Sequence, residues 1–299
     1  MCKVTEGDKT NKMTTEEVIQ KDLYIPKNSV QLSNSPTRPQ IRLGVQGPPK
    51  TGKSHAGLTF PNPVALSFDR GFGAHTHRTD VYEIPMYDPK FVESIVPKGG
   101  VNAPPNRKDA TTKWLCTEGP KLTSNQTLLI DGLTGLQNAY NSWYAQNPIL
   151  NKQGKLDDYA EWRIKVEWFG ELCEIFKSLR CDVVFVGHET PDRNKEGELN
   201  GMVRPLITGQ FGDQLASHFT SWFRALVVAK PVENKEVFMK KYLCDEATLR
   251  EWIASNDTAS IFLWQTISDS VVSCGTSDLV KAPKYVLQAY KTFEKYRRK

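Results

Sequence analysis

The sequence predicts an α/β domain with a mostly parallel sheet and helices on both of its faces. Short apolar segments that suit buried strands alternate along the chain with segments of helical periodicity, and this alternation is typical of βαβ units with right-handed crossovers. The chain has 299 residues, which is long enough to bury one large core of this kind. We therefore expect one principal domain.

The elements can be placed from apolar periodicity. Strands are expected, in chain order, at 41–46, 64–68, 81–85, 127–130, 182–187, 225–230 and 260–266. Helices are expected at 54–60, 88–96, 110–118, 157–179 and 284–298. These elements divide the chain into a weakly ordered arm at 1–40 with one short helix signal, a core at 41–230, and an extension at 231–299 that adds strands and a basic terminal helix.

The composition is that of a soluble globular protein. Hydrophobic residues make up 39% and charged residues 24% of the chain, and no apolar run approaches the roughly 18 residues of a membrane span. The first residues do not resemble a secretory signal, so we expect the protein to stay in the cytoplasm, without a membrane partner. The six cysteines form neither a CxxC pair nor a zinc-ligand spacing, and we interpret them as free thiols.

The segment GPPKTGKS at 47–54 fits the phosphate-binding pattern GxxxxGK[ST] and lies between an expected strand and an expected helix. The two glycines let the loop wrap with its N–H groups inward, and the start of the helix adds positive partial charge. Lys53, expected to face solvent without nucleotide, would reach the β- and γ-phosphates, and the Ser54 hydroxyl would bind Mg²⁺. The expected nucleotide contacts are Gly47, Pro48, Pro49, Lys50, Thr51, Gly52, Lys53, Ser54 and His55.

A second carboxylate is needed to hold the metal ion, and TLLID at 127–131 supplies one. Its apolar residues suit a buried strand and end in Asp131, which is the Walker B pattern. Asp131 would bind Mg²⁺ through water, or else be an ordinary aspartate at the start of a turn. Residue 132 is glycine, so the glutamate that follows this aspartate in many hydrolytic ATPases is absent from its usual place.

With these motifs in this order, the chain resembles the phage nucleotide-binding proteins of the RecA-like P-loop ATPase class, including phage ATPases that assist single-strand annealing recombinases. The resemblance covers about residues 40–230. It depends on five segments, which are IRLGVQGPPKTGKS (41–54), VALSFDRG (64–71), TLLIDGLTGL (127–136), DVVFVGHE (182–189) and RPLITGQFGDQLASHF (204–219). A RecA-like P-loop NTPase core is the fold that the resemblance implies.

The resemblance also implies ATP binding with Mg²⁺, a slow ATPase activity, and single-stranded DNA binding by a homo-oligomer that places each nucleotide at a subunit boundary. A phage recombination or replication protein would be a further partner, and the host cytoplasm the location. Relatives often carry a Lys-x-Arg pair near the last strand to reach the neighbour's γ-phosphate, but this chain has VVSCGTSD at 271–278. The replacement cation stays open among Arg204, Arg224, Lys240 and Lys241.

Four side chains are candidates for catalytic roles near the γ-phosphate. In the RecA class the carboxylate that orients the attacking water follows the strand after the P-loop helix, where this chain has Asp69; Glu83 is a weaker candidate. His188 stands where a RecA-type core puts a polar residue that senses the γ-phosphate, and Glu189 is a third candidate for the base. The alternatives, a turn aspartate and a structural histidine bonded to backbone, stay open.

The carboxyl-terminal segment from Lys281 to Lys299 contains seven basic side chains and one acid, Glu294. Together with loops at 190–212 and stacking aromatics, it could contact the phosphates of single-stranded DNA, or it could be the solvated face of a packing helix. Two other functions remain open. The chain could be a P-loop kinase of a small substrate with 192–201 as a mobile lid, or a non-hydrolysing, nucleotide-dependent assembly factor.

Overall fold

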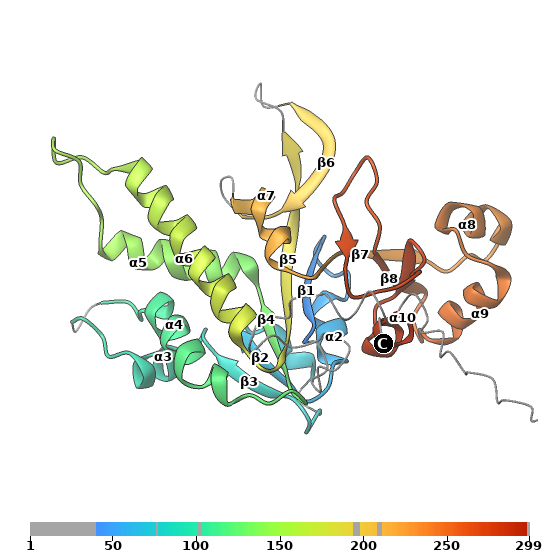
Figure 1. The fold of residues 1–299 in the computed structure, drawn as a ribbon, viewed down its shortest axis with the longest axis horizontal. Helices are drawn as coiled ribbons and strands as arrows, with labels where there is room; N and C mark the ends of the chain where they lie inside the picture. Colours follow the sequence, from blue (N-terminus) through green and yellow to red (C-terminus); the bar gives the residue numbers. More distant parts are fainter. Residues whose placement is uncertain (1–39, 76, 101–102, 194–197, 208–210, 298–299) are drawn as a thin grey trace, which may run out of the picture. The chain divides into compact units, whose positions relative to one another are not determined.

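The computed structural model describes residues 40–75, 77–100, 103–193, 198–207 and 211–297 (Figure 1). The expected arm at 1–40 and its helix therefore lie outside the described residues, apart from Gln40. No helix in the described ranges is both long enough and apolar enough to cross a membrane.

The described strands form one ten-stranded sheet. The strands are β1 (Arg42–Gly47), β2 (Pro63–Ser67), β3 (Tyr82–Pro85), β4 (Thr127–Asp131), β5 (Asp182–Arg193), β6 (Leu199–Pro205), β7 (Ser221–Ala229), β8 (Ser260–Gln265), β9 (Gly275–Thr276) and β10 (Tyr285–Leu287). Their order is β10-β8-β7-β1-β5-β4-β2-β3, with β6 paired to β5 and β9 to β7. The ladders from β7 to β3 are parallel, whereas β8 pairs antiparallel with both β7 and β10. The prediction of a mostly parallel sheet is confirmed.

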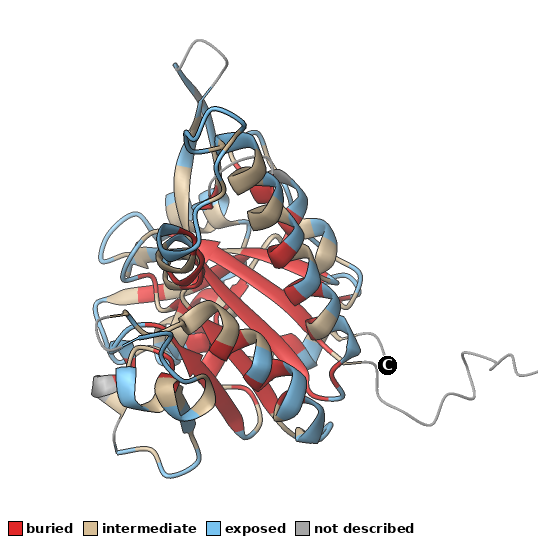
Figure 2. Cartoon of the chain, turned by 90° about the vertical axis from the view of Figure 1, so that its left-hand side faces the viewer, coloured by how far each residue is buried: buried red, intermediate tan, exposed pale blue. Residues whose placement is uncertain are grey.

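Helices cover both faces of this sheet, as expected (Figure 1). The helices are α2 (Lys53–Leu58), α3 (Pro89–Ile95), α4 (Arg107–Thr117), α5 (Leu133–Gln146), α6 (Asp158–Ser178), α7 (Phe211–Leu215), α8 (Lys235–Tyr242), α9 (Glu246–Ala254) and α10 (Tyr290–Tyr296). Successive residues of a strand point to opposite faces. On β4, Leu128 and Ile130 therefore pack in the core formed with α4, α5 and α6, and Leu129 packs in the core formed with α2 and α10. Figure 2 shows the buried strands behind helices with exposed outer faces.

The centre of the sheet is β1, which lies between β5 and β7. The backbone N–H of Ile41 donates to Oδ1 of Asp182 at 2.8 Å, which ties the start of β1 to the start of β5 across 141 positions of sequence. On the other side, Trp222 of β7 covers Gly44 so closely that a Cβ there would lie 1.9 Å from the indole. Only glycine fits this position, and the strand that leads into the phosphate loop is thus held from both sides.

The carboxyl-terminal extension continues the same sheet. β8 pairs along β7. Its residues Ile261 and Leu263 point toward α9 and pack in a cluster with Leu249 and Trp252 of that helix. The predicted terminal helix at 284–298 is wrong in its first part, because residues 285–287 form β10 and pair with β8 instead. The helical spacing of Val286 with later aromatics was misleading, since Val286 is a strand residue opposite Trp264.

Other differences from the expected elements concern the segments between the motifs. Helices α5, α8 and α9 and strand β6 were not anticipated. The segment 192–201, considered above as a mobile lid, contributes its described residues to the ends of β5 and β6, which pair as an antiparallel hairpin (Figure 1). The described cysteines are free thiols, as expected: Cys116, Cys173, Cys181, Cys244 and Cys274.

Candidate nucleotide site

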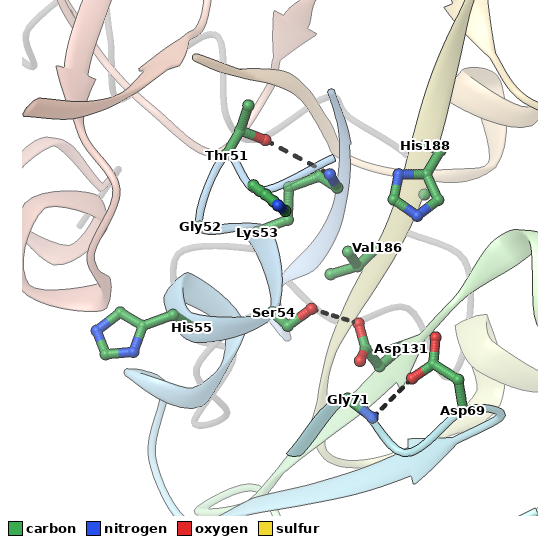
Figure 3. A pocket seen from close by; sticks show the side chains of 12 residues that line it. Thr51, Gly52, Lys53, Ser54, His55, Asp69, Gly71, Asp131, Val186 and His188 are labelled. Carbon is green, nitrogen blue, oxygen red and sulfur yellow. Dashed lines mark hydrogen bonds between the residues drawn. The ribbon is translucent and has the colours of Figure 1, made fainter. Parts of the chain in front are cut away.

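A pocket of about 460 Å³ lies where β1, β2 and β4 end and where β5 leaves its pairing with β1 at His188 (Figure 3). The strand expected to end at 187 continues to Arg193, so His188 lies within β5. The carboxyl ends of parallel strands meet at one edge of a sheet, which is where open α/β folds place their ligands. The pocket thus brings together side chains that are far apart in sequence. The predicted site residues that line the pocket are Lys50, Thr51, Gly52, Lys53, Ser54, His55, Asp69, Asp131 and His188.

The loop from Gly47 to Ser54 takes the wrapped form that the two glycines allow. Gly52 has a φ of 78°, and a Cβ there would lie 2.9 Å from the ring of Phe262. A Cβ on Gly47 would lie 2.6 Å from the carbonyl oxygen of Ala225. Glycine is therefore required at both ends of the loop. Gly47, Pro48 and Pro49, named above as nucleotide contacts, do not line the pocket, and they shape the loop behind it.

Lys53 is buried, so the expectation that it faces solvent is wrong. Its Nζ donates to the carbonyl oxygens of Gly47 at 3.0 Å and Pro48 at 2.6 Å. Burial lowers the pKa of Lys53 to about 8, while the carboxylates of Asp131 and Glu189 oppose this change. The ammonium thus lies where the phosphates of a nucleotide would provide a better partner than neutral carbonyls.

Asp131 ends β4 beneath the first turn of α2. The Ser54 hydroxyl donates to its Oδ1 at 2.7 Å. Burial raises the pKa of Asp131 to about 6, the bond from Ser54 lowers it, and the charge of Asp69 raises it again. A buried carboxylate next to a hydroxyl is an oxygen donor set that suits Mg²⁺, and a cation there would favour the ionised form that burial disfavours.

Asp69 lies beside Asp131 at the end of the neighbouring strand. Its Oδ1 accepts a hydrogen bond of 2.9 Å from the N–H of Gly71. A Cβ on Gly71 would lie 2.8 Å from that oxygen and 3.6 Å from Oδ2 of Asp131, so both carboxylates flank the same glycine. Figure 3 shows the two carboxylates next to one another on the side of the pocket opposite His55. Glu83, the weaker candidate, is exposed on β3 and does not line the pocket.

His188 and Glu189 have different surroundings although they are adjacent on β5. His188 lines the pocket, and its Nδ1 is buried without a hydrogen-bond partner among the described residues. Burial lowers the pKa of His188, and the nearby Lys53 adds to this effect. Glu189 does not line the pocket, because Arg224 of β7 donates to both of its carboxylate oxygens, at 2.9 and 2.7 Å.

The ion pair of Glu189 and Arg224 also concerns the side chains considered above as replacements for the Lys-x-Arg pair. Arg224 is bound to Glu189 of its own chain, and the Nε of Arg204 lies 3.3 Å from Oδ1 of Asp192. Lys240 and Lys241 are exposed at the end of α8. Sequence reasoning missed Gly71, Val186 and Gly187 as lining residues. The turn after Asp69 and the apolar residue before Gly187 are signals that would have pointed to them.

A phosphate loop between the central strand and a helix, with a buried carboxylate ending a nearby parallel strand, defines a P-loop NTPase domain. The family model described as "AAA domain" matches residues 40–247, and the chain belongs to this family. No curated protein matches the chain.

Two solved structures are similar at low identity. The RadB recombinase is 13% identical with a TM-score of 0.33, over 62% of this chain and 74% of that one. The assembled ATPase EscN from the type III secretion system of enteropathogenic E. coli is 12% identical with a TM-score of 0.34, over 62% of this chain and 42% of that one.

Proposed function

We propose that the protein binds ATP with Mg²⁺ and hydrolyses it to ADP and phosphate. The observation that carries this proposal is the grouping, in one pocket, of the Lys53 ammonium with the hydrogen-bonded pair of Ser54 and Asp131. The same grouping holds phosphate and metal in P-loop proteins generally. The family described as "AAA domain" supports nucleotide as the ligand class.

Each of these side chains has a distinct role in binding. Lys53 leaves the carbonyls of Gly47 and Pro48 and donates to β- and γ-phosphate oxygens instead. Ser54 and Asp131 would hold Mg²⁺, and the bound ion would neutralise phosphate charge. The N–H groups of the loop and of the first turn of α2 bind the remaining phosphate oxygens.

We assign the orientation of the attacking water to Asp69. Its carboxylate lines the pocket, whereas that of Glu189 is held by both donors of Arg224. His188 is proposed to contact the γ-phosphate, since it lines the pocket beside Lys53 and its Nδ1 has no partner among the described residues. Because His188 lies within β5, contact with the γ-phosphate there could report hydrolysis to the hairpin of β5 and β6.

The wider role that we propose is phage DNA recombination, single-strand annealing or replication, with binding of single-stranded DNA. The order of the five motifs supports it, as do the exposed lysines Lys281 and Lys291 of the carboxyl-terminal segment. A homo-oligomer is proposed because no arginine is among the described residues that line the pocket. A neighbouring subunit would supply the cation that stabilises the γ-phosphate during transfer.

One experiment tests the activity. The purified protein is incubated with Mg²⁺ and ATP, with and without single-stranded DNA, and release of phosphate is followed. Phosphate release that DNA stimulates is the expected result. Transfer of phosphate to an added small acceptor would instead indicate a kinase, and nucleotide-dependent oligomerisation without turnover an assembly factor.

A further inference from the structure

A second cavity, of about 760 Å³, adjoins the phosphate pocket. Its walls come from α2, from the loop between α9 and β8, and from β10 and the start of α10. Gly52 and His55 line both cavities, so the two meet at the phosphate loop and the first turn of α2. The combined space is larger than the phosphates and a metal ion need.

The relative positions of the two cavities fix the direction of a bound nucleotide. The carboxylates of Asp69 and Asp131 mark the metal end of the phosphate pocket, and His55 projects from α2 on the opposite side (Figure 3). The second cavity opens on the His55 side. A nucleotide with its γ-phosphate at the carboxylates would therefore extend its nucleoside over α2 into the second cavity.

The walls of this cavity suit a planar base. On β8, Ile261 and Leu263 are buried against α9, so the alternate residue Phe262 faces the other way, toward Gly52. Leu287 of β10 also lines the cavity, but its side chain packs with Leu263 in the cluster under α9. The aromatic ring of Phe262 offers apolar contact on a base, which is a usual feature of a cofactor pocket.

Gln288 supplies one oriented acceptor in this cavity. Its Nε2 donates to the carbonyl oxygens of Leu263 at 2.8 Å and Leu226 at 3.2 Å, which fixes the orientation of the amide. Its Oε1 is buried and has no hydrogen-bond partner among the described residues. An unpaired buried acceptor is costly, and a donor from a ligand would offset the cost. The exocyclic amino group of adenine is such a donor, whereas the 6-keto oxygen of hypoxanthine would oppose the acceptor.

We propose that this cavity is the nucleoside subsite of the P-loop and that Gln288 favours adenine over a 6-keto purine. The proposal rests on the proposed function, because it takes the phosphates to lie against Lys53. It also gives the carboxyl-terminal segment a role in nucleotide recognition, since β10 and α10 contribute to the wall.

The test compares three ligands on three forms of the protein. Mg·ATP, Mg·ITP and Mg·tripolyphosphate are titrated by calorimetry into the wild type, Ser255→Trp and Ala254→Trp. Ser255 is exposed and lines the cavity, so a tryptophan there would fill it without disturbing the core. Ala254 is exposed on the same turn but does not line the cavity, which makes it the matched control.

We expect Ser255→Trp to weaken ATP binding by about tenfold or more, because the tryptophan would fill the cavity and the nucleoside would lose its contacts there. Tripolyphosphate binding should stay within about twofold in all three forms, because it uses the phosphate pocket alone. The wild type should prefer ATP to ITP by about fivefold, the value of one hydrogen bond.

Two results would overturn the subsite. The first is the same ATP affinity in Ser255→Trp and in Ala254→Trp. The second is the same affinity of the wild type for ATP and for tripolyphosphate. Equal affinity for ATP and ITP would overturn the role of Gln288 in selecting adenine. Failure of the wild type to bind either ATP or tripolyphosphate would instead refute the proposed function, so the two failures are distinguishable.

Discussion

The Ser54 hydroxyl donates a hydrogen bond of 2.7 Å to Oδ1 of Asp131, and so joins the phosphate loop to the end of β4 across 77 positions of sequence. Both partners are oxygen ligands of the kind that Mg²⁺ prefers. The hydrogen bond compensates in part for burial, which raises the pKa of the Asp131 carboxyl. The proposed metal site therefore predicts effects both on nucleotide binding and on the pH dependence of stability.

Lys53→Ala should weaken nucleotide binding by about 10- to 100-fold, which is the value of charged hydrogen bonds to phosphate. The fold should persist, because the carbonyls of Gly47 and Pro48 that Lys53 contacts can take water as a partner. Calorimetry measures the affinity and circular dichroism the fold. Lys152→Ala, at an exposed turn outside the pocket, is the control. Unchanged ATP affinity in a folded Lys53→Ala protein would refute the site assignment.

Asp131→Asn keeps the size of the side chain and removes its charge. Mg²⁺-dependent nucleotide binding should weaken by about tenfold or more, as for groups that hold a metal through water. Turnover should be lost. The measurement is ATP affinity with Mg²⁺ and with EDTA, and the expected effect appears only with Mg²⁺. An active variant with normal Mg²⁺ dependence would show that Asp131 is an ordinary turn residue.

The pH dependence of stability should also identify Asp131. Burial raises its pKa from 3.8 to about 6, so the folded state binds a proton more tightly than the unfolded state. The ionised form costs stability, and this cost is absent below about pH 4 and grows as the pH rises to 6. Without nucleotide or metal, the melting temperature of the wild type should fall relative to Asp131→Asn over this window. Glu171→Gln, at an exposed carboxylate, should show no such difference.

Asp69→Asn should bind ATP normally and lose about 100-fold or more in turnover, because a group that orients water acts on the transition state. Glu189→Gln is the comparison, since its carboxylate is bound to Arg224 outside the pocket. The two rates of phosphate release are measured at saturating ATP. Normal turnover of Asp69→Asn together with an inactive Glu189→Gln would identify Glu189 of β5 as the base.

DNA binding by the carboxyl-terminal segment should appear as a salt dependence. Each lysine that contacts a phosphate of single-stranded DNA contributes about −0.7 to the slope of log affinity against log salt. Lys281→Gln and Lys291→Gln should each flatten the slope by that amount if both make contact. Lys284 is a poorer choice, because its Nζ lies 3.0 Å from Asp269. An unchanged slope in both variants would refute the DNA role of this segment.

Deleting residues 291–299 would not test DNA binding cleanly. Phe293 is buried in the core shared with α2, and Arg297 pairs with Glu294. Truncation should therefore lower the melting temperature first. The burial of Phe293 supports the view that α10 is a packing element. Lys281 before α10 and Lys291 within it are exposed and stay candidates for phosphate contact.

The sequence was informative where a motif is local or where strand ends must converge. The loop at 47–54 carries its own conformation in its glycines. Asp69 follows β2, Asp131 ends β4, and His188 lies where β5 leaves its pairing with β1, so all three reach the same edge of the sheet. The pairing of Glu189 with Arg224 could not be foreseen, because it depends on β7 lying beside β1. The second cavity escaped prediction for the same reason, since its wall needs the antiparallel pairing of β8 and β10.

The order of the strands in the sheet has a consequence for synthesis. β2, β3 and β4 are neighbours in the sheet and follow one another along the chain. β1 is synthesised before them but has no partner until β5 emerges. The bond from Ile41 to Asp182 spans 141 positions, which at about 5–20 residues per second corresponds to roughly 7–28 s of translation. During that delay the apolar strand before the phosphate loop is unpaired on the ribosome. Chaperone binding to nascent chains should therefore peak before residue 182 and fall once β5 has paired with β1.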